Sequence, residues 1–148
     1  MLRVTNSSEF QQAMDLIGKK LKEDAEIIVK KLAMDAFVSV VNYTARDTGY
    51  AANNWDIAVN QLASDQVWAK PKGASKNEFQ DAKIDQTEFE KIDYKSYIRI
   101  FNNTEYIKYL EYGTPKMAAQ PMVKPTELKL YRQAEGIARA LSIKNYDY

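Results

Sequence analysis

The feature that most constrains the fold is an apolar stripe through the first third of the chain. Its residues are spaced alternately three and four apart, so they share one face of an α-helix. They are Phe10, Met14, Ile17, Leu21, Ala25, Ile28, Leu32, Ala36 and Val40. Ser8 and Gln11 have capping-box spacing, which predicts a helix start at Ser7 or Ser8. The helix is expected to end between Tyr43 and Arg46.

The length of this helix, which occupies most of residues 1–46, is a second constraint. At a rise of about 1.5 Å per residue the rod is roughly 50 Å long, more than a compact domain of 148 residues covers. We therefore expect part of the stripe to contact another chain. Residues 1–48 hold seven basic and seven acidic side chains. The lysines of the helix thus indicate a solvated face with ion pairs rather than a nucleic-acid patch.

Two later segments have the alternation of half-buried strands. In the first, Trp55, Ile57 and Val59 alternate with polar or small residues. The second covers residues 94–101, where aromatic residues on the other face suggest that both faces are covered. Residues 66–69 have a weaker strand pattern. Together these segments predict a small, mainly antiparallel sheet.

The chain beyond the sheet predicts two more helices. Residues 104–112 are expected to form a short helix that Gly113 ends. Pro121 and Pro125 disfavour helical conformation in the residues before them, so residues 117–125 are expected to be extended. The last helix is then expected over residues 126–142.

The stretch between the strands is polar. Residues 70–95 hold six bases and six acids around few apolar side chains, which predicts a projecting loop or a loosely packed hairpin. Residues 66–95 are therefore expected to be a variable loop or arm. The whole chain, residues 1–148, is then one α+β domain. A long N-terminal helix and a C-terminal helix pack on a small, mainly antiparallel sheet from which the long loop projects.

Composition excludes several classes of site. The chain has no cysteine and no histidine, which removes disulfides, thiolate nucleophiles, Cys/His zinc sites and any Ser–His–Asp triad. Two acid pairs, Glu23 with Glu26 and Glu88 with Glu90, are interpreted as solvated structural residues. Without a glycine-rich phosphate loop either, we expect no enzyme, no cofactor and no metal site.

The overall charge and hydropathy narrow the range of partners. A formal net charge of +1 supplies no global attraction to DNA or anionic lipid. No segment reaches the ~18 consecutive apolar residues that a membrane span needs. The start of the chain has no apolar segment typical of a signal peptide, and a cytosol-like compartment is expected.

Several residues have local roles that follow from their chemistry. Gly49 can supply a positive φ in a turn where Asp47 or Thr48 bonds the backbone. Trp55 is a large anchor whose indole N–H needs one partner. Glu111 falls in the last turn of a helix, where a negative charge opposes the helix dipole. We therefore expect a basic partner for it on a neighbouring element or subunit.

Three tyrosines recur every third residue along the predicted short helix: Tyr106, Tyr109 and Tyr112. Such a stripe can stack on nucleic-acid bases. A face turned toward the core or toward another subunit is the more common use of this pattern, and it is the favoured interpretation.

Four motifs follow one another along the chain. They are DTGY at residues 47–50, NNW at 53–55, YIKYLEYGT at 106–114 and QPMVKP at 120–125. In this order they resemble the head–tail joining family of tailed bacteriophages, also described as tail-completion or neck proteins. The resemblance covers nearly the whole chain except residues 66–95, where that family varies. Departures from the family pattern are Ile107 in place of a small residue, Met122 in place of Phe and Lys124 in place of Arg.

The resemblance implies a non-enzymatic structural protein of the virion, made in the bacterial host cytoplasm. It would lie in the neck, as a ring at the head–tail interface or at the head-proximal end of the tail. Six or twelve copies would surround the DNA channel without binding DNA specifically, and would contact neighbouring neck, connector and tail proteins. The candidate structural and interface residues are Asp47, Gly49, Trp55, Tyr106, Tyr109, Glu111, Tyr112, Gly113, Gln120, Pro121 and Pro125.

Two functions from other classes remain open. Residues 116–148 hold six bases and three acids, which allows a small nucleic-acid-binding or regulatory module that uses the basic C-terminal third. That function predicts salt-dependent binding of DNA or RNA. A carboxylate-based, metal-dependent hydrolase would require acidic side chains that converge in space.

Overall fold

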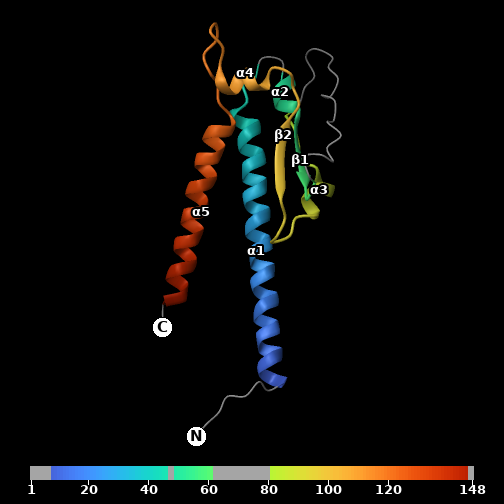
Figure 1. Ribbon diagram of the computed structural model, residues 1–148, viewed down its shortest axis with the longest axis vertical. Coiled ribbons are helices and arrows are strands. Elements are labelled where there is room, and N and C mark those ends of the chain that lie inside the picture. The colour runs from blue at the N-terminus through green and yellow to red at the C-terminus, as the bar shows by residue number, and fades with distance from the viewer. Residues whose placement is uncertain (1–7, 47–48, 62–80, 147–148) are drawn as a thin grey trace.

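The computed structural model describes residues 8–46, 49–61 and 81–146. Its longest element is helix α1, Ser8–Tyr43. Figure 1 shows α1 between a two-stranded sheet on one side and helix α5, Val123–Tyr146, on the other. This arrangement confirms the predicted α+β fold with long N-terminal and C-terminal helices and a small antiparallel sheet. The weak strand expected at residues 66–69 lies outside the described residues.

The sheet consists of strand β1, Trp55–Val59, paired antiparallel with strand β2, Ile98–Asn102. The second strand begins later than residue 94, where the alternation predicted it. A turn precedes it, because Oδ1 of Asp93 accepts the N–H of Lys95 at 2.8 Å and the N–H of Asp93 donates to Oγ of Ser96 at 2.8 Å. Such side-chain bonds compete with strand pairing.

The core lies where the second half of α1 crosses the sheet. Its buried residues come from α1, β1 and two segments later in the chain: Ala33, Phe37, Val40, Val41, Trp55, Ile57, Val59, Ile92 and Met122. Among the α1 residues whose burial is described, Ala33 is the first that is buried. The half of α1 that precedes it therefore extends beyond the core (Figure 1).

Residues 81–95 pack on the core instead of projecting from it. Helix α3, Gln86–Glu90, lies beside β1, and Ile84 and Phe89 pack against the core cluster. Ile92 is only 1% exposed. The predicted loop over residues 66–95 is therefore wrong for its second half. A few apolar side chains are enough to fix a short segment when all of them converge on one patch.

Helix α4 covers Ile107–Tyr112, within the predicted short helix. The last helix starts earlier than the predicted residue 126, because α5 begins at Val123 and includes Pro125 in its first turn. Proline is tolerated there, since the N–H groups of the first turn have no acceptor within the helix. The expected extended conformation up to Pro125 is thus wrong for its last residues.

The contact between α1 and α5 includes polar bonds. Nζ of Lys129 donates to Oγ of Ser39 at 3.0 Å, and Nε2 of Gln133 donates to Oδ2 of Asp35 at 3.2 Å. Among the α5 residues whose burial is described, Thr126 is the last that is buried. Helix α5 is therefore held at its start and along one side, while most of its surface remains exposed.

Candidate functional site

The junction between α4 and α5 is organised by Glu111. Its Oε2 accepts the backbone N–H groups of Met122 at 2.6 Å and Val123 at 3.0 Å, and its Oε1 accepts that of Lys124 at 3.1 Å. Pro125, next in line, has no N–H. One carboxylate thus satisfies the donors that open α5, which are normally left without acceptors.

The charge of Glu111 suits this position. Burial of its carboxyl group favours the neutral form, but the three N–H donors favour the carboxylate more strongly, so the pKa lies below its usual value. The predicted basic partner is therefore replaced by the positive end of the α5 dipole. The sequence pattern does not reveal such a partner, because the donors are backbone groups.

Gly113 closes α4 in a conformation that requires glycine. Its φ is 76° and its ψ is −179°, and a Cβ built there would lie 2.8 Å from the backbone nitrogen of Ala119 and 2.9 Å from the carbonyl oxygen of Met117. A short bridge between Thr114 and Met117 follows. This turn brings the chain back toward α4, which makes the contact of Glu111 with α5 possible.

The proline segment completes the junction. The backbone N–H of Gln120 donates to the carbonyl oxygen of Leu110 at 2.7 Å, which satisfies an acceptor at the end of α4. Met122 is fully buried, whereas the side chains of Gln120 and Pro121 are exposed. The motif residues of 106–125 are thus brought together by mutual backbone contacts.

The predicted turn at Gly49 has the expected backbone conformation. Gly49 has a φ of 80°, in the left-handed region, and precedes helix α2, Tyr50–Asn53. Its carbonyl oxygen accepts the N–H of Asn53 at 2.9 Å. Asp47 and Thr48, either of which was predicted to bond the backbone in this turn, lie outside the described residues.

Trp55 is the predicted anchor. It is 4% exposed, and its indole Nε1–H donates to Oγ1 of Thr44 at 2.7 Å. The Thr44 hydroxyl donates in turn to the carbonyl oxygen of Val40 at 2.6 Å. This chain of bonds ties the sheet to the last turn of α1, so Trp55 has a structural role.

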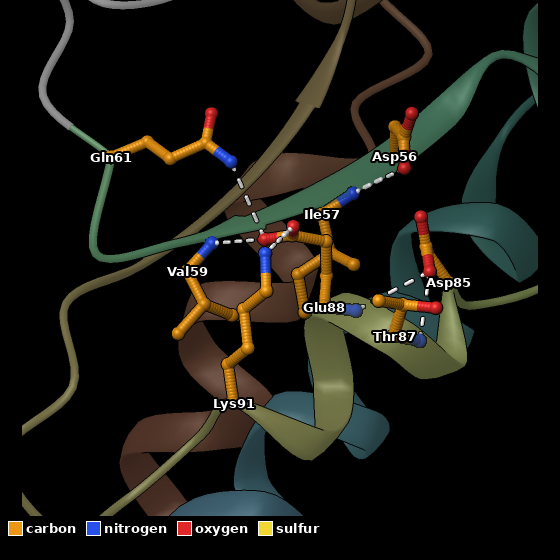
Figure 2. A network of polar contacts seen from close by, with 8 residues as sticks. All are labelled: Asp56, Ile57, Val59, Gln61, Asp85, Thr87, Glu88 and Lys91. Atoms are coloured by element: carbon orange, nitrogen blue, oxygen red, sulfur yellow. Dashed lines mark hydrogen bonds and ion pairs between the residues drawn. The ribbon is translucent and has the colours of Figure 1, made fainter.

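A second carboxylate, Glu88, has a role that the sequence did not indicate (Figure 2). Its Oε2 accepts the N–H of Val59 on β1 at 3.0 Å, and its Oε1 is paired with Lys91. The bond from Lys91 outweighs the opposing effect of burial and, with that from Val59, holds the pKa of Glu88 below its usual value. Asp85 caps helix α3, which carries Glu88, by accepting the N–H of Thr87 at 2.9 Å.

The three tyrosines of the predicted stripe are exposed. Tyr112 is the most exposed of them at 83%. The ring of Tyr106 lies 6.2 Å from that of Tyr50 between centroids, and Nζ of Lys108 lies 5.0 Å from the ring centre of Tyr109. A face toward the core is thereby wrong. Contact with another subunit or stacking on a ligand stays a prediction.

Several large apolar side chains on the two long helices are exposed. On the projecting half of α1, Met14, Ile17 and Leu21 are 48%, 54% and 64% exposed. On α5, Leu128, Tyr131 and Leu141 are also exposed. Exposed apolar side chains at helical spacing are typical of a surface that contacts another chain, and for this protein that contact stays a prediction.

Three basic residues of the C-terminal third, Lys124, Lys129 and Arg132, lie in the first half of α5. An open groove of about 530 Å³ lies between this part of α5 and the end of α1, and Tyr43, Lys129 and Arg132 are among its lining residues. Lys129 is bonded to Ser39 there. Part of the basic charge therefore contributes to the packing of α5 on α1.

Over the described ranges, no group of three or more acidic side chains is placed to hold a metal ion. None of the helices in those ranges combines the length and the apolar character that a bilayer crossing requires. No protein-family model, curated protein or solved structure matches the chain. The function proposed below therefore rests on the exposed apolar side chains of α1 and on the junction between α4 and α5.

Proposed function

We propose that this chain is a structural component of the neck of a tailed-phage virion. Copies of it form a ring around the DNA channel, at the head–tail interface or at the head-proximal end of the tail. The protein is not an enzyme in this function and uses no cofactor. Its action is geometric: it joins neighbouring rings and leaves a passage for DNA.

The observation that carries the proposal is the exposed apolar stripe on the projecting half of α1. Met14, Ile17 and Leu21 lie on a helix segment that comes before Ala33, the first α1 residue described as buried. A monomer gains nothing from holding such a stripe in water. A ring in which each copy covers the stripe of the next removes it from water at every position.

The motifs at residues 106–125 support the same proposal. They resemble those of neck proteins, and here they form one compact junction through Glu111, Gly113 and the N–H of Gln120. This junction fixes the point from which α5 starts. A ring subunit needs such fixed geometry, since small angular errors accumulate from copy to copy and prevent closure.

The first test is the native mass of the purified protein over a range of concentrations, with negative-stain images of any large species. We expect a closed ring of six or twelve copies with a central hole. Salt-sensitive retardation of DNA by the monomer would instead favour the nucleic-acid module. That retardation would have to disappear when the basic residues of α5 are replaced by Ala, at Lys124, Lys129, Arg132 and Arg139.

The second test is genetic and does not depend on ring formation in isolation. A suppressible stop codon in this gene of the producing phage is expected to give DNA-filled heads and finished tails that remain separate. Purified protein added to such an extract should restore joining. A normal yield of infectious virions without the protein would overturn the proposed function.

A further inference from the structure

The outer edge of β1 is occupied by side chains of the protein itself. The N–H of Val59 donates to Oε2 of Glu88 at 3.0 Å, on helix α3 beside the strand. The N–H of Ile57 donates to Oδ1 of the neighbouring Asp56 at 2.8 Å (Figure 2). A strand edge whose donors are satisfied in this way is not free to pair with another chain.

The outer edge of β2 differs from that of β1. Asn60, which follows β1, donates its N–H to the carbonyl oxygen of Tyr97 at 2.8 Å, so Tyr97 and every second residue after it face β1. The N–H and C=O groups of Ile98 and Ile100 therefore point away from β1. Within residues 8–46, 49–61 and 81–146, none of these four groups has a hydrogen-bond partner. The edge of β2 thus presents donors and acceptors at the spacing that a further strand requires.

A groove of about 250 Å³ lies along the same strand. Ile100 and Asn102 line it from β2, and Ile107, Tyr112 and Val123 line it from α4 and the start of α5. The side chains of an added strand share a face with the β2 residues that they lie opposite. A side chain opposite Ile100 is therefore directed to the face that Ile100 contributes to the groove, where a large apolar side chain finds room.

The other face of β2 carries a positive charge without an acidic partner. Arg99 directly precedes Ile100 and so lies on the opposite face of the strand. Its guanidinium carbon lies 5.9 Å from the ring centre of Tyr97, and no carboxylate in the described part of the chain forms an ion pair with it. An acidic side chain on an added strand would lie beside Arg99 and complement its charge.

We propose that the outer edge of β2 binds an extended segment of a different protein, which adds a third strand to the sheet. The segment pairs its backbone with Ile98 and Ile100, places a large apolar side chain in the groove and an acidic one beside Arg99. A second copy of this chain is a poorer partner, because pairing two β2 edges brings two Arg99 side chains onto one face. This contact is additional to the proposed ring and does not depend on it.

The probe is a capped, fluorescently labelled peptide of about nine residues in which Leu alternates with Glu. The alternation gives it one apolar and one acidic face in either strand direction. Two matched peptides keep these side chains and carry N-methyl groups, one on the amides of its Leu residues and the other on those of its Glu residues. Each methylated peptide thus has one edge that no longer donates hydrogen bonds.

Fluorescence anisotropy with the full-length protein should show that the parent peptide binds and that only one methylated peptide loses binding. Strand addition uses one edge of the peptide, so methyl groups on the other edge leave the affinity unchanged. The methylated peptide that fails to bind identifies the strand direction. Absence of binding by the parent peptide, or equal effects of the two methylations, would overturn the inference.

Amide hydrogen exchange, followed by NMR on the full-length protein, tests the edge directly. In the free protein the amides of Ile98 and Ile100 should exchange many-fold faster than those of Arg99 and Phe101, which face β1. The parent peptide should slow the exchange of Ile98 and Ile100 several-fold. Equal protection of all four amides in the free protein would overturn the inference, because the edge would then already be paired.

A charge reversal tests the acidic character of the partner. Arg99→Glu should bind the parent peptide several-fold more weakly and should prefer a peptide in which Lys replaces Glu. Arg139→Glu, at an exposed position on α5, is the matched control and should keep the preference of the wild type. The recovery of binding with the Lys peptide shows that the variant is folded. The same preference in Arg99→Glu as in the wild type would overturn the proposed contact with Arg99.

These outcomes are distinguishable from those that test the proposed function. Peptide binding at β2 together with normal virions in the stop-codon phage would support the strand site and overturn the neck function. Separate heads and tails in that phage, with no peptide binding, would support the neck function and overturn the strand site.

Discussion

At the scale of single residues, Glu111 offers the sharpest test. Glu111→Gln is expected to reduce the free energy of unfolding by about 1–3 kcal/mol, because a neutral amide oxygen accepts the N–H groups of Met122, Val123 and Lys124 more weakly. Urea unfolding at neutral pH measures the loss. Glu135→Gln, at an exposed position in the middle of α5, is the matched control, and equal losses in the two variants would contradict the capping role.

The same residue makes stability depend on pH in a defined direction. The pKa of Glu111 is lowered on folding, so in the acid range the unfolded chain binds more protons than the folded one. The contribution of Glu111 is complete above the ordinary carboxyl pKa of about 4.3 and is lost as the pH falls through the lower folded value. The stability difference between wild type and Glu111→Gln should therefore shrink on acidification. A constant difference down to about pH 3 would contradict this.

Two glycines form a matched pair. Gly113→Ala is expected to destabilise the protein by about 1–3 kcal/mol, because its φ of 76° is strained for alanine and its Cβ would meet the backbone of Met117 and Ala119. Gly136→Ala, within α5 and with open space around the added Cβ, should stabilise the helix by about 0.5–1 kcal/mol. Thermal unfolding distinguishes the two variants. A similar change of melting temperature in both would contradict the requirement for glycine at position 113.

Substitutions of Trp55 test the contact between the sheet and α1. Trp55→Ala is expected to cost about 3–5 kcal/mol, as large aromatic truncations in cores do. Trp55→Phe keeps most of the packing and isolates the bond to Thr44. Chemical unfolding of both variants provides the comparison. A loss below about 1 kcal/mol in Trp55→Ala would mean that the side chain is not in the core.

The residue-level predictions succeeded where chemistry is local. The positive φ of Gly49 and the burial of Trp55 follow from residue type, and the structure confirms both. The identity of a distant partner does not follow in the same way. Thr44 as the acceptor for Trp55, and the backbone donors for Glu111, depend on how turns bring segments together in space.

At the scale of elements, strong periodicity was sufficient to predict a helix or strand, and weak periodicity was not. Helix α1 was predicted because its apolar spacing extends over many residues. Strand β1 was predicted because its large apolar residues alternate with polar or small ones. The start of α5 was missed, because a proline in a first turn looks like a helix stop in sequence. Helix α3 was missed, because its five residues are too few to show a period.

Ile92 tests whether the segment after α3 belongs to the core. Its side chain is buried within the cluster that includes Phe37 and Ile57, so Ile92→Ala is expected to cost about 2–5 kcal/mol. The exposed neighbour Lys91 gives no comparable control because it is paired with Glu88, so Glu90→Ala is used instead. Equal unfolding midpoints for the two variants in urea would show that this segment is dispensable.

At the scale of the whole molecule, folding and assembly use separate parts of α1. Leu21→Asp is expected to leave the melting temperature of the monomer unchanged within about 2 °C, because the side chain is exposed. The same change should abolish the large species, since it places a charge in the apolar contact. Native mass and thermal unfolding measured on one sample decide this. Leu16→Asp, on another side of the helix, should still form the large species. Loss of the large species in this variant would contradict the assignment of Met14, Ile17 and Leu21 as the contact surface.

The junction at Glu111 also makes the start of α5 depend on α4. The acceptor for the first turn of α5 belongs to the last turn of α4, and the turn between them has Gly113 at a φ of 76°. The carboxylate is made before the helix that it caps during synthesis of the chain. The position at which α5 begins is therefore set by a residue that precedes it in the chain, so a change in α4 or in the turn also alters the start of α5.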